Sequence, residues 1–267
     1  MPASLDSIVS ATRKRVSESR GSADLRALER KAAEHTPRGF RERLRRTAHD
    51  GPAIIAELKK ASPSKGLIRA DFRPAELARE LEQSGATALS VLTDEEFFQG
   101  ALDHLQQAST VTSLPCLRKD FIVDEVQILE ARAYCADAIL LIVAALEQKD
   151  LIAFARSAQN HELDVLCEVH DEAELQRALD AGSDLIGVNS RDLKTFHVDL
   201  ATAFRLAEKL PSDRVRVAES GIHSGANVAR LRCAGYDAFL IGESLMKIEH
   251  PGEALKILLE EAKVVVS

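Results

Sequence analysis

Eight short apolar runs recur along the chain at a nearly constant spacing, and this regularity limits the possible folds. The runs begin at Ala53, Thr87, Leu114, Ala138, Asp164, Leu185, Val215 and Ala238. Seven steps cover the 185 residues from the first start to the last, or about 26 residues each, which suits one strand, one helix and their connections. Residues 74–85, 125–136 and 172–182, which lie between runs, have apolar residues at helical spacing. The pattern predicts parallel strands that alternate with helices.

Eight such units can close into a (β/α)8 barrel or form an open, doubly wound sheet. After the first run the chain reads KKASP at residues 59–63, without the G-x-G-x-x-G turn of dinucleotide-binding sheets. The phosphate-binding motif G-x-x-x-x-G-K-[ST] is also absent from the sequence. We therefore predict an α/β protein with a single (β/α)8 TIM barrel over residues 51–267. Residues 1–50 are expected to form a helical extension that flanks the barrel mouth.

The charge balance favours a small-molecule partner. Lys and Arg total 35 against 42 Asp and Glu, which gives a net charge of −7. Such a chain has no general positive field to attract nucleic acid or an anionic membrane. A local cluster of arginines is interpreted as the solvated face of a helix; it contains Arg38, Arg41, Arg43, Arg45 and Arg46.

Other sequence features argue against a membrane span and a metal site. The longest apolar run, residues 138–146, has nine residues, whereas a membrane helix needs about 20. Residues 1–16 lack the continuous apolar core of a secretory signal, so we expect a cytoplasmic protein. The four cysteines form no C-x-x-C pair and the eight histidines show no metal-ligand spacing. We expect reduced cysteines and no metal.

Polar residues gather at the ends of the predicted strands, where the active site of a (β/α)8 barrel lies. Glu57 and Lys59 are two residues apart and share one face of the first strand. Opposite charges inside a barrel mouth are costly unless they are paired or bind a ligand. Other strand ends carry Lys119 with Asp120, Glu168, Asn189 with Arg191, and Glu219 with Ser220. Each alone could be a surface pair or a turn, but together they indicate a site for an anionic, oxygen-rich substrate.

Two segments of small residues follow the seventh and eighth strands. Ser220 and Gly221 follow the seventh, and Gly242, Glu243 and Ser244 follow the eighth. Their backbone N–H groups can face one anion, as in the phosphate site of many such barrels. The alternative is that these residues only make turns.

Several motifs resemble the indole-3-glycerol phosphate synthase family. The run IAELKKASPSKG at residues 55–66 is similar to that family's signature segment. Further matches occur in the family's order: LTDEEFFQG at 92–100, LRKDFIVDEVQI at 117–128, LCEVH at 166–170, GVNSRDL at 187–193, AESGI at 218–222 and IGESLM at 241–246. The resemblance spans roughly residues 40–250.

The resemblance implies a lyase of tryptophan biosynthesis without cofactor or metal. Its substrate would be 1-(2-carboxyphenylamino)-1-deoxyribulose 5-phosphate, which bears a phosphate and a carboxylate, and its products indole-3-glycerol phosphate, CO₂ and water. By motif, Lys119 would be the general acid and Glu168 the general base. Glu57 with Lys59 would serve proton transfer and hold the carboxylate, while Asn189 and Arg191 would position the intermediate. The implied substrate- and phosphate-binding residues are Ser62, Phe98, Ser220, Gly221, Gly242, Glu243 and Ser244.

Two alternatives stay open at this point. A sister phosphate-binding barrel, phosphoribosylanthranilate isomerase, would be expected to carry a cysteine at the end of the first strand, where this chain has Glu57 and Lys59. A barrel that binds a phosphorylated ligand without catalysis is the other alternative. The sequence does not indicate an oligomeric state.

Two finer expectations concern single residues. We expect desolvation and the neighbouring charge of Lys59 to lower the pKa of Lys119 in the free protein. We expect Ser62 to contact the substrate, although a Ser before Pro63 could instead be the N-cap of a helix.

Overall fold

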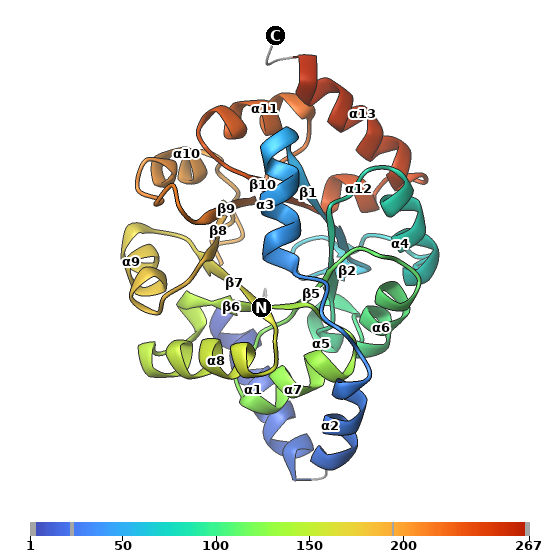
Figure 1. The fold of residues 1–267 in the computed structure, drawn as a ribbon, viewed down its shortest axis with the longest axis vertical. Helices are drawn as coiled ribbons and strands as arrows, with labels where there is room; N and C mark the ends of the chain where they lie inside the picture. The colour runs from blue at the N-terminus through green and yellow to red at the C-terminus, as the bar shows by residue number, and fades with distance from the viewer. Residues whose placement is uncertain (1–3, 22–23, 194, 265–267) are drawn as a thin grey trace.

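The computed structural model describes residues 4–21, 24–193 and 195–264, and it contains a closed barrel of eight parallel strands (Figure 1). The barrel strands are β1 (Ala53–Leu58), β4 (Ala88–Leu92), β5 (Cys116–Lys119), β6 (Ala138–Ile142), β7 (Asp164–Val169), β8 (Leu185–Asn189), β9 (Val215–Glu219) and β10 (Ala238–Ile241). Around the barrel their order is β1-β10-β9-β8-β7-β6-β5-β4. The predicted (β/α)8 barrel is confirmed. Residues 1–3 and 265–267 of the two expected segments lie outside the described residues.

Helices follow the strands and surround the barrel (Figure 1). The outer helices are α4 (Pro74–Gln83), α6 (Leu102–Thr110), α7 (Glu125–Ala133), α8 (Gln148–Asn160), α9 (Glu172–Asp180), α10 (Ala201–Ala207), α11 (Gly225–Cys233) and α13 (Pro251–Val264). Shorter elements lie in the connections: the strands β2 (Ala61–Ser62) and β3 (Gly66–Leu67), the helices α5 (Glu95–Phe98) and α12 (Glu243–Met246), and the 3₁₀ turn η1 (Val143–Ala145).

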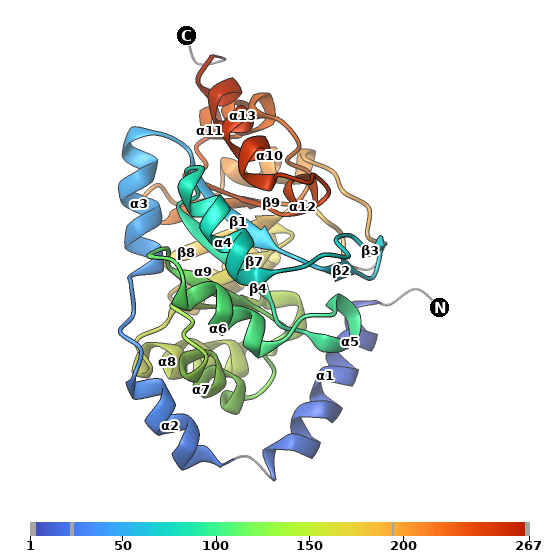
Figure 2. The same cartoon turned by 90° about the vertical axis from the view of Figure 1, so that its right-hand side faces the viewer.

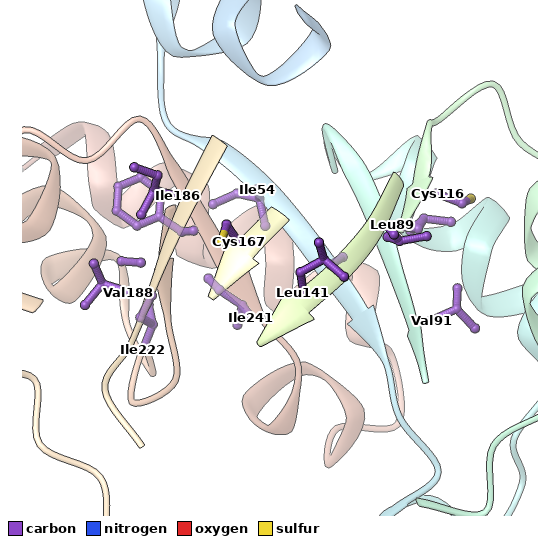
Figure 3. Packing of buried hydrophobic residues seen from close by; sticks show 14 of the residues in the cluster. Ile54, Leu89, Val91, Cys116, Leu141, Cys167, Ile186, Val188, Ile222 and Ile241 are labelled. Atoms are coloured by element: carbon purple, nitrogen blue, oxygen red, sulfur yellow. The ribbon is translucent and has the colours of Figure 1, made fainter. Parts of the chain in front are cut away.

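The strands are apolar along their length because both of their faces are covered. Outward-facing side chains such as Ile54, Leu141 and Ile186 belong to a buried cluster between the barrel and its helices, part of which Figure 3 shows. Inward-facing side chains such as Ile55 and Leu117 form a second cluster inside the barrel. This double burial produces the continuous apolar runs that the sequence displays.

The two ends of the barrel are closed differently. The helices α1 (Leu5–Arg20), α2 (Leu25–Ala33) and α3 (Phe40–Asp50) precede β1. Phe40 and Leu44 of α3 are fully buried and join the cluster inside the barrel, so α3 closes its floor. Figure 2 shows α3 on one side of the barrel, with α1, α5 and the β2–β3 hairpin at the opposite end. Because apolar side chains fill the floor, polar side chains can gather only at the opposite end of the barrel, where the strands terminate.

An ion-pair network fastens the segment before α3 to the barrel floor. The side chain of Asp137 is fully buried and accepts hydrogen bonds from Arg38 Nη2 at 2.6 Å and from Arg38 Nε at 3.0 Å. Nε2 of His35 lies 3.0 Å from the same carboxylate. Arg41 pairs with Asp184 at 2.5 Å. The expectation of a solvated arginine face is therefore wrong for Arg38, whose side chain is bound to the buried Asp137, whereas Arg41 and its partner Asp184 stay partly exposed.

We expect Asp137→Asn to lower the free energy of unfolding by about 3 kcal/mol, because it leaves the Arg38 guanidinium without its buried counter-ion. The pKa of Asp137 is lowered, since burial alone would raise it but His35 and Arg38 stabilise the carboxylate. A lowered pKa contributes stability above the unfolded value of about 3.9 that is lost as the pH falls through the folded value. Urea unfolding should show a smaller difference in the free energy of unfolding between wild type and Asp137→Asn at pH 3.5 than at pH 7. Glu42→Gln, which breaks the exposed Arg46 pair, should change stability by less than about 0.5 kcal/mol.

Candidate active site

A cavity of about 440 Å³ opens at the carboxyl ends of the strands. All eight strand ends contribute to its wall, together with α1 and the β2–β3 hairpin loop. The structure brings twelve of the thirteen sequence-predicted site residues to this wall: Glu57, Lys59, Phe98, Lys119, Glu168, Asn189, Arg191, Ser220, Gly221, Gly242, Glu243 and Ser244. The cavity is the candidate active site.

Ser62 is the predicted site residue that does not line the cavity. It lies in β2, where it pairs with Gly66 of β3. Its neighbours Pro63, Ser64 and Lys65, in the turn of this hairpin, reach the wall instead. No helix starts at Ser62, so the N-cap alternative is wrong. A substrate contact by Ser62 stays a prediction.

Glu57 and Lys59 form a close pair at the end of β1. Nζ of Lys59 donates a hydrogen bond of 2.5 Å to Oε1 of Glu57. The carboxylate lies over Gly242 of the neighbouring strand end, and a Cβ atom at that position would collide with it. Glycine at 242 therefore makes room for Glu57, in addition to any part it takes in binding.

Lys119 stands at the end of β5 between two buried carboxylates. Its Nζ lies 3.2 Å from Oε2 of Glu168 and 3.8 Å from Oε2 of Glu219. Both glutamate side chains are 1% exposed. Lys119 and Glu168 are thus in direct contact, although 49 residues separate them in the sequence.

The pKa of Lys119 is raised, which corrects the expected lowering. Burial disfavours the ammonium form, but the negative charges of Glu168, Glu219 and Glu57 outweigh it. The repulsion expected from Lys59 is weakened because Lys59 is bound to Glu57. The pKa of Glu168 is lowered, since burial raises it but Lys119, His170 and Asn189 stabilise the carboxylate. In the free protein the two groups form an ion pair.

Glu219 is a site residue to which the sequence assigned no role. Neither of its carboxylate oxygens has a hydrogen-bond partner among the described residues. Burial, together with repulsion from Glu168, raises the pKa of Glu219 to about 8. Its side chain fits because Gly187 on the adjacent β8 has no Cβ, which would collide with the carboxylate. The sequence feature that could have identified Glu219 as a site residue is its position at a predicted strand end, next to Ser220.

Asn189 and Arg191 are fixed against each other at the end of β8. Oδ1 of Asn189 accepts a hydrogen bond of 3.0 Å from the backbone N–H of Arg191. The Arg191 guanidinium lies 3.6 Å from the carboxylate of Glu243, which also pairs with Lys247 at 2.6 Å. Glu243 therefore faces cations on both sides instead of leaving its charge free in the cavity.

One wall of the cavity is apolar. The rings of Phe98 and Phe121 lie 6.3 Å apart between their centroids, and both line the cavity. Leu5 and Ile8 of α1 add aliphatic surface. The strand pattern did not point to these two residues, because α1 comes from outside the repeating units. The wall can bind an aromatic ring by apolar contact.

Another part of the cavity wall contains the two segments of small residues. Ser220 and Gly221 have φ angles of 66° and 76°. The left-handed backbone is uncommon for a serine and such conformations cluster at ligand sites. Oγ of Ser244 donates a hydrogen bond of 3.2 Å to the carbonyl oxygen of Ile222, which ties the second segment to the first. The two segments therefore lie next to each other in the cavity wall, and a phosphate site between them stays a prediction.

Within residues 4–21, 24–193 and 195–264, no group of three or more His, Cys, Asp or Glu side chains could hold a metal ion. None of the described helices is long and apolar enough to cross a membrane.

A family model for indole-3-glycerol phosphate synthase matches residues 5–258. The chain belongs to the indole-3-glycerol phosphate synthase family. A synthase of this name from Koribacter versatilis (strain Ellin345) is 57% identical over 259 residues, which cover 97% of this chain and 100% of the relative. Another from Polaromonas naphthalenivorans (strain CJ2) is 46% identical over 96% of this chain and 98% of the relative. The sequence resemblance is confirmed, and membership in the synthase family does not favour the sister isomerase or the non-catalytic barrel.

Solved structures share the barrel at low sequence identity. Thiamine phosphate pyrophosphorylase from Pyrococcus furiosus gives a TM-score of 0.61 at 17% identity and covers 83% of this chain and 100% of its own. KGPDC from Streptococcus mutans gives 0.60 at 12% identity and covers 81% and 99%. These likenesses support the fold, whereas the synthase family is shown by the closer sequence matches.

We expect Glu219→Gln to remove a pH dependence of stability. A carboxyl group with a folded pKa near 8 and an unfolded pKa near 4.3 binds more protons in the folded state between those values. Wild-type stability should therefore fall with rising pH in that window, by up to about 1.4 kcal/mol per pH unit relative to the variant, and level off above it. Urea unfolding from pH 5 to pH 9 measures the slope. Glu260→Gln, at an exposed position on α13, should show no such slope, and an unchanged slope in Glu219→Gln would refute the assignment.

Proposed function

We propose that this chain closes the ring of 1-(2-carboxyphenylamino)-1-deoxyribulose 5-phosphate to give indole-3-glycerol phosphate, CO₂ and water. The observation that carries the proposal is the convergence of Lys119, Glu168 and the Glu57–Lys59 pair on one cavity. That cavity also has an apolar wall for the aromatic ring and two small-residue turns for the phosphate. Family membership supports the same activity.

The substrate's two anionic groups suggest how it binds. The phosphate would lie against Ser220, Gly221 and the segment from Gly242 to Ser244, where backbone N–H groups can contact its oxygens. The carboxylate would face Lys59, whose ammonium group is already beside the cavity. The phenyl ring would then lie between these ends, against Phe98 and Leu5.

Lys119 would act as general acid in the ring closure. The aromatic carbon that bears the carboxylate attacks the carbonyl carbon, and the carbonyl oxygen takes the Lys119 proton to become a hydroxyl group. The C–CO₂ bond then breaks, and its electron pair returns to the ring. A raised pKa in the free protein does not prevent this transfer, because the developing alkoxide is a stronger base than a lysine amine.

Loss of water would need a second proton transfer. The hydroxyl group would leave as water with a proton donated by Lys59 of the Glu57–Lys59 pair, and the neighbouring carbon would give up a proton so that the five-membered ring becomes aromatic. Glu168 would accept that proton, since its carboxylate is ionised in the free protein and borders the cavity. Asn189 would help to hold the Glu168 carboxylate, because its side chain helps to lower the pKa of that group.

An isomerase of the sister type would require a catalytic cysteine at the mouth. None of the four cysteines, all in the described part of the chain, lines the cavity. We further propose that residues 1–50 form a helical extension outside the repeating units of residues 51–267, in which α1 flanks the mouth as expected but α3 closes the floor instead. We also propose that the protein acts in the cytoplasm without a nucleic-acid or membrane partner. Four free cysteines and the net charge of −7 support the second point.

We expect Lys119→Met to lower kcat by a factor of about 10²–10⁴, because the stem is kept and the proton donor is lost. Steady-state turnover of the carboxyphenylamino sugar phosphate, followed by indole fluorescence, measures the loss. Retention of more than a tenth of wild-type kcat, where chemistry limits turnover, would rule out Lys119 as the acid and make Lys59 the next candidate.

The control for Lys119 is a lysine at the same end of the barrel. Lys149→Met removes an exposed lysine that follows β6 and pairs with Glu147, and it should leave kcat within about twofold of wild type. Arg118, although adjacent to Lys119, is unsuitable as a control. Its side chain is 4% exposed and donates hydrogen bonds to Asp120 and to the backbone of Gln127, so its loss would destabilise the fold.

We expect Ser244→Asp to raise KM at least about tenfold, or about 1.4 kcal/mol, because it puts a like charge at the proposed phosphate position. Steady-state kinetics with the phosphorylated substrate measures this. The control Ser224→Asp adds the same charge at the N-cap of α11, outside the cavity wall, where Asp also caps well. Substituting Gly242 would be ambiguous because it would also displace Glu57. An unchanged KM in folded Ser244→Asp would place the phosphate elsewhere.

A further inference from the structure

A histidine and a second glutamate stand behind Glu168. His170 follows β7 directly, and its Nε2 lies 3.4 Å from Oε1 of Glu168. On the other side of the ring, Nδ1 lies 2.9 Å from Oε2 of Glu174 in the first turn of α9. The same Glu174 oxygen accepts a hydrogen bond of 2.8 Å from the backbone N–H of His170. Glu174 therefore fixes both the backbone and the ring of His170.

The geometry of the ring determines its protonation state. A carboxylate can only accept, so Nδ1 must carry the proton that is donated to Glu174. In a neutral imidazole Nε2 would then present a lone pair to the Glu168 carboxylate, which is repulsive. Nε2 is buried and has no hydrogen-bond partner among the described residues. A protonated ring resolves the conflict, since it turns Nε2 toward Glu168 as a donor.

The charged groups around His170 come from several elements. Glu168 belongs to β7 and Glu174 to α9, while Glu219 at the end of β9 adds negative charge to the same region. Lys119 of β5 lies on the far side of Glu168 and contacts its other oxygen. Glu168 is therefore placed between two cationic side chains, Lys119 inside the cavity and His170 behind the wall.

We propose that Glu174 and His170 are positioning residues that keep Glu168 ionised and oriented during turnover. The proposal rests on the role of Glu168 as general base in the proposed function. When Lys119 gives its proton to the substrate, it no longer stabilises the Glu168 carboxylate, whereas the His170 cation stays. Glu168 then remains able to accept the proton released in the dehydration. Burial alone would lower the pKa of His170, but Glu174 and Glu168 raise it, as this role requires.

The first test is the pH profile of His170→Asn. Removing a cation close to a carboxylate raises the carboxylate's pKa, typically by about one to three units. The acidic limb of kcat should therefore move to higher pH by that amount, with a smaller loss of kcat at high pH than at neutral pH. A variant that loses activity equally at every pH would show a structural role and overturn the proposal.

The second test separates the two positioning residues. Glu174→Gln keeps a hydrogen-bond acceptor at Nδ1 but removes the charge that stabilises the imidazolium. It should therefore also move the acidic limb of kcat to higher pH. Because both substitutions act through one ring, the double variant should shift the limb no further than His170→Asn alone. Additive shifts would overturn the coupling. His49→Asn, which removes an exposed histidine paired with Asp50, is the control and should leave the profile unchanged.

A titration without turnover keeps the proposal testable if a variant folds poorly. NMR of the His170 ring in the wild-type protein should give a pKa above the ordinary value of about 6.5, and Glu168→Gln and Glu174→Gln should each lower it. A wild-type pKa at or below 6.5 would overturn the proposal. Full kcat in Glu168→Gln would instead overturn the role of Glu168 as base, and the NMR titration distinguishes that failure from a failure at His170.

Discussion

The ammonium group of Lys119, placed between the buried carboxylates of Glu168 and Glu219, is the interaction on which the barrel mouth depends. Two carboxylates this deeply buried repel each other, and the cation compensates one of them. The other is relieved by protonation, since the pKa of Glu219 is raised to about 8. At neutral pH the mouth therefore carries one negative charge fewer than its number of glutamates suggests, which favours the binding of an anionic substrate. The same balance couples the protonation of Lys119, Glu168 and Glu219 to one another.

This cluster can exist because the barrel provides room for it. Inward-facing positions on neighbouring strands lie in layers, and β8 pairs with β9 so that Asn189 is opposite Glu219. Gly187, one inward position earlier on β8, leaves space for the Glu219 carboxylate, as Gly242 does for Glu57. The lower layer is filled by apolar side chains and sealed by Phe40 of α3. The same strand register therefore places the packed apolar layer toward the floor of the barrel and the open space with its polar side chains at the mouth.

Much of this arrangement was predictable from the sequence. The observed strands begin within two residues of the expected ones, because strands covered on both faces give continuous apolar runs. Strand alternation placed Glu57 and Lys59 on one face, and positions at strand ends grouped Lys119 and Glu168 with them. The raised pKa of Lys119 was not predictable, since it arises from carboxylates on three other strands at distances that the sequence does not contain. The place of Ser62 likewise depends on its pairing with Gly66, a local geometry that motif matching cannot supply.

The N-terminal helix is part of the site geometry although it lies outside the repeating pattern. The Arg15 guanidinium of α1 is 3.5 Å from Asp94 after β4 and 3.9 Å from Asp120 after β5. The backbone N–H of Leu5 donates to the carbonyl oxygen of Leu193 after β8. Helix α1 thus bridges three connections at the mouth while its apolar residues line the cavity. Because Asp120 directly follows Lys119 in the chain, displacement of α1 would disturb the residue next to the proposed acid, whereas α3 contacts the barrel floor far from it.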